Sequence, residues 1–209
     1  AGGVVGVSVT IDRRRIIGWG AALALAPAAA RAQSNPFTLG VASGEPLPDG
    51  FVIWTRLAPD PLAPDGRGGM ERPASVEWQV AEDEAMKRIV RRGRVRADDK
   101  LGWSVHVEVA GLSPNRDYFY RFTAMGAQSP VGRGRTAPAP GAPLTSYKIA
   151  AASCAHFEAG WFSAYRHMAA ERPDLVLFLG DYIYEYSYAG ERAARAVRRH
   201  SVQGELRDL

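Results

Sequence analysis

The 209-residue sequence is poor in cysteine, in lysine and in long apolar runs, and each shortage excludes a class of protein. Its single cysteine, Cys154, excludes an intramolecular disulfide and with it a disulfide-stabilised secreted scaffold. Because Lys87, Lys100 and Lys148 are the only lysines, nearly all of the positive charge is arginine. The net charge of +4 is spread along the chain without a clustered basic stripe, so we expect no specific nucleic-acid partner.

The longest apolar run covers residues 16–30 and falls short of the roughly 20 residues that a membrane span needs. Three arginines at 13–15 precede it, and the small-x-small segment Ala30-Arg31-Ala32 follows it, which is the order typical of a signal peptide. We interpret residues 1–32 as a twin-arginine signal peptide, with the twin-arginine export machinery as partner and a periplasmic or extracellular location. An uncleaved amphipathic anchor is the alternative.

Residues 36–138 show the period-two alternation of half-buried β-strands. The alternation is seen at 76–80, 105–109 and 118–122, and turn sequences lie at 48–50, 64–66, 93 and 113–115. Short strands at this spacing predict an antiparallel β-sandwich of the fibronectin III or immunoglobulin type. The segment 83–90 fits either a short helix or an edge strand.

Four side chains in this region are expected to have structural roles and not to bind a ligand or a metal. Tyr118 follows Leu-Ser-Pro at 112–114 in the manner of a tyrosine corner, whose phenol bonds to backbone. Trp54 and Trp78 are expected in the core. His106 alternates with apolar strand residues and is expected to face solvent.

A proline-rich stretch at 139–146 predicts a linker, because its prolines cannot complete a strand ladder. Beyond it, residues 147–209 change pattern. An apolar strand is predicted at 147–152, a helix at 162–171, and at 175–179 a continuous apolar strand of the kind buried on both faces. Strand, helix and strand of this length predict a βαβ unit with parallel strands.

The chemistry of this unit is expected where its strands end, because functional residues of parallel sheets lie at the carboxyl edge. Cys154 follows the first strand, and Asp181 and Tyr184 follow the second, after Gly180, which would let the backbone turn sharply. Thiolate, carboxylate and phenolate are donors for a Lewis-acidic metal ion. A cysteine-dependent phosphatase would need an arginine six residues after Cys154, where the sequence has Gly160.

These motifs together resemble the PhoD-type alkaline phosphatases, from about residue 37 to the end. The matching segments are FTLGVASGEP at 37–46, VIWTRL at 52–57, GL at 111–112, YFYRF at 118–122, SPVGR at 129–133, ASC at 152–154 and GDYIYEY at 180–186. The resemblance implies a β-sandwich followed by the start of an α/β metallophosphatase domain. It also implies an exported metal-dependent phosphomonoesterase and phosphodiesterase that acts on phosphate esters.

The resemblance further implies a site with one ferric ion and calcium. Cys154 would bind iron, Asp181 would bridge iron and calcium and serve catalysis, and Tyr184 would bind iron through its phenolate. The family's later ligands, an Asp-Asp-His segment and further Asp and His residues, would lie beyond residue 209. The chain is therefore expected to be an N-terminal fragment, inactive by itself, and a monomer.

Four further side chains are candidates for additional ligands, namely His156, His167, His200 and Glu185. Each also fits an ordinary structural or solvated position. The alternative function is a non-catalytic exported β-sandwich binding module with an incomplete metal site.

Overall fold

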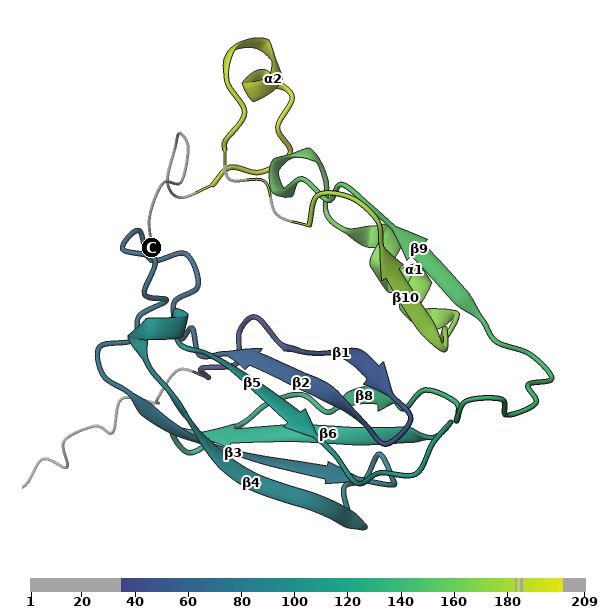
Figure 1. Ribbon diagram of the computed structural model, residues 1–209. Coiled ribbons are helices and arrows are strands. Elements are labelled where there is room, and N and C mark those ends of the chain that lie inside the picture. The colour runs from purple at the N-terminus through teal and green to yellow at the C-terminus, as the bar shows by residue number, and fades with distance from the viewer. Residues whose placement is uncertain (1–34, 183, 185, 201–209) are drawn as a thin grey trace, which may run out of the picture. The chain divides into compact units, whose positions relative to one another are not determined.

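The computed structural model describes residues 35–182, 184 and 186–200 (Figure 1). The predicted signal peptide at 1–32 and Glu185 lie outside the described residues. No helix in the described ranges is long and apolar enough to cross a membrane. The described chain consists mostly of antiparallel strands, which confirms the predicted sandwich, followed by a small parallel unit.

Two antiparallel sheets face each other in the first part of the described chain (Figure 1). One has the order β1-β2-β5, formed by β1 (Val41–Leu47), β2 (Gly50–Arg56) and β5 (Ser104–Val109). The other has the order β4-β3-β6-β7, with β8 also paired to β6. Its strands are β3 (Ala74–Ala81), β4 (Ile89–Ala97), β6 (Asp117–Ala124), β7 (Ala127–Gln128) and β8 (Gly132–Arg135). A single 3-10 turn, η3 (Asp99–Leu101), leads into β5.

The core lies between these sheets and follows from the alternation in the sequence. Along β6, every second side chain is buried, as in the series Tyr118, Tyr120 and Phe122. They pack with inward residues of β2 and β3 such as Ile53 and Val76. Burial of large apolar and aromatic side chains is the main stabilising contribution in such a sandwich.

The predicted tyrosine corner is present. The buried phenol oxygen of Tyr118 accepts a hydrogen bond from the backbone N–H of Ser113 at 2.9 Å. His106 is exposed on β5, as predicted. Trp78 is half-buried and packs against the core, whereas the prediction for Trp54 is wrong. Trp54 lies on the opposite face of β2 from the buried Ile53 and packs beside His106.

Two local predictions need correction. Gly93 does not form a turn but lies inside β4, directly opposite Trp78. A Cβ at this position would lie 2.6 Å from the indole, so glycine is needed there for close packing. The segment from Asp83 is neither a helix nor, before Ile89, a strand. The carboxylate of Asp83 accepts hydrogen bonds from the backbone N–H groups of Lys87 and Arg88, and these bonds close a turn before β4 begins.

The second part of the described chain is the predicted βαβ unit. Strands β9 (Ile149–Ala152) and β10 (Leu175–Phe178) pair in parallel, and helix α1 (Ser163–Ala170) joins them. A 3-10 turn, η4 (Phe157–Ala159), precedes α1, and a short helix, α2 (Gly190–Ala194), follows β10. The predicted linker at 139–146 contains neither helix nor strand.

The prediction that the second strand is buried on both faces does not hold for this chain. Val176 keeps 47% of its surface exposed and Leu177 keeps 40%. The reason is that β10 pairs only with β9 among the described strands, so one edge and part of each face have no neighbour. Tyr165 of α1 packs near Phe178 and covers one of these faces in part.

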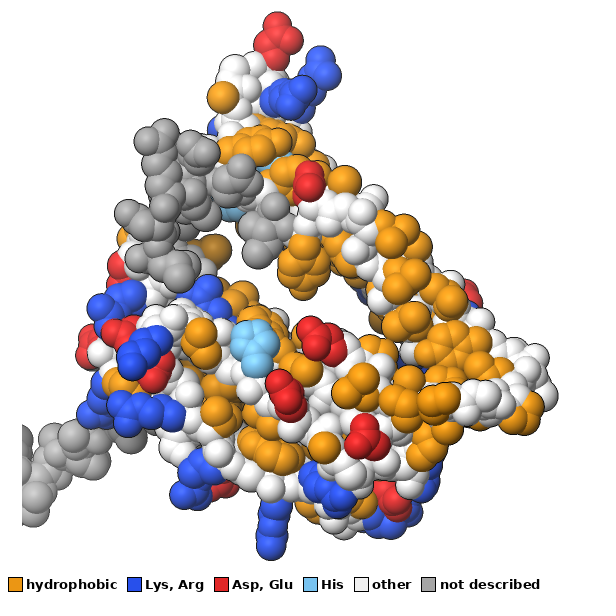
Figure 2. All heavy atoms as spheres, in the orientation of Figure 1, with side chains coloured by type: hydrophobic (Ala, Val, Ile, Leu, Met, Phe, Trp, Pro, Cys, Tyr) orange, Lys and Arg blue, Asp and Glu red, His pale blue; other side chains and the backbone are white. Residues whose placement is uncertain are grey.

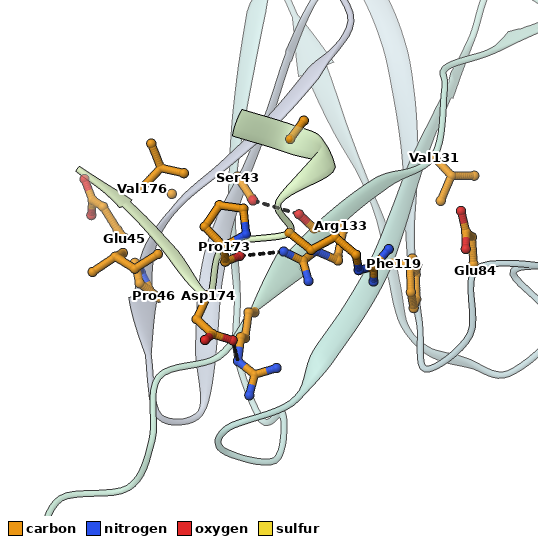
Figure 3. Close-up of a pocket in the computed structure, with 15 residues that line it drawn as sticks. Ser43, Glu45, Pro46, Glu84, Phe119, Val131, Arg133, Pro173, Asp174 and Val176 are labelled. Carbon is orange, nitrogen blue, oxygen red and sulfur yellow. Dashed lines mark hydrogen bonds and ion pairs between the residues drawn. The ribbon is translucent and has the colours of Figure 1, made fainter. Parts of the chain in front are cut away.

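The turn between α1 and β10 contacts β8 through charged groups. Arg135 pairs with Asp174 at 3.2 Å, and Arg133 donates to the carbonyl of Pro173 at 2.6 Å. Both guanidinium groups also pair with Asp117, at 2.9 and 3.1 Å. Figure 3 shows the cleft of about 450 Å³ beside these contacts. Two of the arginines that line this cleft, Arg133 and Arg135, are thus already paired with carboxylates.

Candidate metal centre

The carboxyl ends of β9 and β10 bring the predicted site residues to one sheet edge. Phe178 pairs directly with Ala152, and the N–H of Leu179 donates to the carbonyl of Ala152 at 2.8 Å. Cys154 therefore leaves one strand beside the point where Asp181 leaves the other. Adjacent strands lie only about 4.8 Å apart, so side chains from both ends can meet without an intervening strand.

Gly180 is required at this edge for a different reason from the one predicted. Its φ angle is not in the positive region, so glycine is not needed there for a left-handed turn. Instead, a Cβ on Gly180 would lie 2.7 Å from the sulfur of Cys154 and 2.9 Å from Cβ of Ser153. The absence of a side chain lets the two strand ends approach closely enough to share a site.

Cys154 itself has a strained backbone. Its φ is 55°, in the left-handed region that residues with a Cβ seldom occupy. The thiol is exposed at the end of β9 rather than buried as a small hydrophobic group. Such backbone strain is frequent at functional sites, and at Cys154 it coincides with an exposed thiol that interacts with Tyr184 and Asp181.

The thiol, phenol and carboxylate interact with one another. A hydrogen bond from the Tyr184 phenol, followed by one from the backbone N–H of Asp181, lowers the pKa of the Cys154 thiol. The same bond to Cys154 raises the pKa of Tyr184, and desolvation and the Asp181 carboxylate raise it further. The structure therefore brings all three predicted residues together, with Tyr184 as proton donor and the Cys154 sulfur as acceptor.

A thiol, a phenol and a carboxylate at one point are better explained as ligands of a metal ion than by a purely structural role for the cysteine. Three oxygen or sulfur donors interact with one another at this edge, and a cation would replace the shared proton. Within the described ranges, no group of three His, Cys, Asp or Glu side chains forms a metal site. The candidate centre therefore depends on the phenol of Tyr184 as its third donor.

One of the histidines, His156, lies next to the candidate centre. His156 is buried, with its Nδ1 accepting the N–H of Glu158 at 3.1 Å and its ring packed 4.9 Å from that of Tyr184. His167 is exposed on α1. His200 donates its backbone N–H to a carboxylate oxygen of Glu158 at 3.1 Å.

Sequence reasoning missed Glu158, which is fully buried in η4. Its carboxylate accepts the backbone N–H of Tyr188 as well as that of His200. The bond from Tyr188 is the first cause that lowers the pKa of Glu158, so the buried group remains a carboxylate. A local signal was absent, because its partners lie 30 and 42 residues further along the chain.

Comparisons with known proteins agree with this architecture. A family model described as the N-terminal domain of PhoD-like phosphatases matches residues 22–138, and one described as PhoD-like phosphatase matches residues 149–209. The chain is 54% identical over 159 residues to alkaline phosphatase D of Bacillus subtilis (strain 168). That match covers 76% of this chain and 27% of the Bacillus protein.

A solved structure described as that of PhoD matches with a TM-score of 0.75 and 50% sequence identity. It covers 83% of this chain and 33% of the solved chain. The present chain thus spans about a third or less of the length of these two relatives.

Proposed function

Because the chain belongs to the PhoD-like phosphatase family, we propose that it is the N-terminal part of an exported, metal-dependent hydrolase of phosphoric esters. The activity would be that of an alkaline phosphatase, as named for the Bacillus relative. The substrate class would be phosphomonoesters and phosphodiesters, which the family resemblance implies. Export by the twin-arginine machinery would place the protein in the periplasm or outside the cell. The protein would be a monomer. The single observation that carries the proposal is the meeting of Cys154, Asp181 and Tyr184 at one sheet edge.

The three residues would hold a ferric ion and a calcium ion, with Asp181 shared between them and Cys154 and Tyr184 on the iron. When bound, the two metals would neutralise phosphoryl oxygens and activate water as the nucleophile. Cys154 would lose its proton readily on binding the metal, because the hydrogen bond from Tyr184 already favours the thiolate. Tyr184 keeps its proton until a cation takes the place of that bond. Asp181 orients the thiolate through its N–H and can direct its carboxylate to a second ion.

The test uses the full-length protein loaded with iron and calcium. A bound ferric ion should give a visible charge-transfer band, which Tyr184→Phe and Cys154→Ser should each shift or bleach. Asp181→Asn should abolish hydrolysis of a chromogenic phosphate ester and reduce calcium content. Tyr182→Phe is the matched control, because Tyr182 is exposed and packs on Phe178 instead.

A colourless iron-loaded protein, or a band that Tyr182→Phe alters as much as Tyr184→Phe, would contradict the assignment. Full-length protein that folds but binds no metal and hydrolyses no ester would favour the alternative of a non-catalytic binding module.

A further inference from the structure

The chain forms an arginine-rich loop directly after the candidate centre, and we call residues 187–200 the arginine loop. It contains four arginines, at 192, 195, 198 and 199, and one acidic residue, Glu191, which gives a net charge of +3 without His200. Helix α2 lies within it. Figure 2 shows basic side chains projecting around the part of the chain where Figure 1 places α2. In the described part of the chain, the loop therefore carries a net positive charge at its surface.

The two ends of the arginine loop are closed by one buried carboxylate. Glu158 accepts the N–H of Tyr188 at the start of the loop and that of His200 at its end. The carbonyl of Glu158 also accepts the N–H of Val197 at 3.0 Å. Because Glu158 is 0% exposed, water cannot replace these bonds while the loop is closed. The loop is thus held at its base in a defined position.

One of the four arginines anchors the loop instead of facing solvent. The guanidinium of Arg198 lies 3.8 Å from the ring centroid of Phe157 and 4.4 Å from that of Phe162. Its Nε donates to the carbonyl of Phe157. Arg192, Arg195 and Arg199 are exposed, and Arg199 also donates to the carbonyl of Ala193 at 2.7 Å, so three positive charges lie at the surface of a loop whose base is fixed.

The base of the loop is coupled to the candidate centre through aromatic rings. Tyr188 stacks on His156 with ring centroids 4.2 Å apart, and His156 packs 4.9 Å from Tyr184. Two ring contacts therefore connect the first residues of the loop to a predicted metal ligand. Figure 1 shows that the arginine loop follows the end of β10, the strand after which Asp181 and Tyr184 also stand in the sequence.

We propose that the arginine loop binds the anionic part of a substrate beyond the phosphoryl group that is cleaved. This inference rests on the proposed phosphatase function and narrows its substrate class to esters carrying several phosphates. The reason is charge complementarity, since three exposed arginines beside a phosphate-binding site attract and retain polyanions. A monoester of a neutral alcohol has no further charge for the loop to contact. Glu158 is a positioning residue that sets where the loop lies.

The experiment compares two inhibitors of chromogenic ester hydrolysis by the full-length protein, namely inorganic polyphosphate and orthophosphate. Replacing Arg192, Arg195 and Arg199 together by Gln should raise the inhibition constant of polyphosphate by roughly tenfold, a factor of about two to three per exposed contact. The constant for orthophosphate should change by less than about twofold, because one phosphate does not reach the loop. The salt dependence of polyphosphate inhibition should also weaken.

The matched control is the triple replacement of Arg92, Arg94 and Arg96 by Gln. These arginines are exposed on β4 of the sandwich, so the control removes equal charge elsewhere. It should leave both inhibition constants unchanged. An equal effect of the two triple variants, or none from the loop variant, would overturn the proposal.

The role of Glu158 in holding the base of the arginine loop is tested separately with Glu158→Ala and Glu158→Gln. Trypsin cleaves after arginine, so release of the loop by Glu158→Ala should speed cleavage within residues 192–199 and raise the polyphosphate constant. Glu158→Gln retains one acceptor oxygen and should fall between wild type and Glu158→Ala. Unchanged cleavage in Glu158→Ala would show that Glu158 does not hold the loop.

If the wild-type protein hydrolyses no ester, the proposed function fails, but the loop can still be tested. Direct titration with polyphosphate then replaces inhibition as the measurement. Loss of polyphosphate binding in the loop variant alone supports the anion site without the reaction. Equal binding by wild type and the loop variant refutes the site as well.

Discussion

Replacement of Tyr118 by phenylalanine isolates one hydrogen bond of the sandwich. The substitution removes only the phenol oxygen, which accepts the N–H of Ser113 at 2.9 Å. The buried ring stays in place, so packing between the sheets is unchanged. A typical net contribution of one such bond is about 1 kcal/mol. An orphaned donor deep in the core would cost up to about 3 kcal/mol, but Ser113 is exposed and water can replace the lost acceptor in part.

The assay is urea denaturation of the chain, followed by circular dichroism. With a slope of about 2 kcal/mol per molar urea, a loss of about 1 kcal/mol moves the midpoint down by about 0.5 M at unchanged slope. Tyr147→Phe is the control, because the Tyr147 phenol has no hydrogen-bond partner among the described residues. The iron and calcium content of the full-length protein should not change. A midpoint equal to that of the control, or altered metal content at full stability, would refute the tyrosine corner as a purely structural feature.

Three further predictions concern close packing and a buried phenol. Gly180→Ala should lower iron binding in the full-length protein, because its methyl group would collide with the ligand thiol; Gly160→Ala, which has open space, should not, and equal binding by both would contradict this. Gly93→Ala should lower the unfolding free energy by about 1–3 kcal/mol by pressing on Trp78, and an unchanged urea midpoint would show that the indole moves aside freely. Burial raises the pKa of Tyr120 to about 12, so stability should be complete below pH 10 and fall by about 2–3 kcal/mol as pH rises toward 12. Tyr120→Phe should remove that part of the alkaline loss, and an unaltered pH profile would contradict the assignment.

The sandwich could be predicted because its strands bury one face each. Along β6 the aromatic residues of one parity enter the core, and the alternation in the sequence reports this directly. Trp54 shows where the pattern stops being informative. Val52, Ile53 and Trp54 are all apolar, so the sequence does not reveal which parity faces inward. Pairing of β2 with two neighbours, and the packing of Ile53 into the core, decide it.

Contacts between residues far apart along the chain could not be predicted in the same way. The closing of the arginine loop depends on Glu158 meeting Tyr188 and His200, and neither spacing corresponds to a helical or strand period. Gly93 carried an ordinary turn signal, yet its role is set by the indole across the strand pair. Such features arise from tertiary packing, which periodicity does not encode.

The candidate centre could be predicted from the sequence only in part. Topology alone predicts that Cys154 and Asp181 leave neighbouring parallel strands at one edge. Their actual meeting needs two features that topology does not supply, namely the missing side chain at Gly180 and the left-handed backbone of Cys154. A left-handed non-glycine residue costs about 1–3 kcal/mol and persists only where neighbouring contacts fix it. Here the register of β9 with β10 and the bond from Leu179 to Ala152 fix it. The strain is therefore held by the sheet, which keeps the thiol, phenol and carboxylate together before any ion is bound.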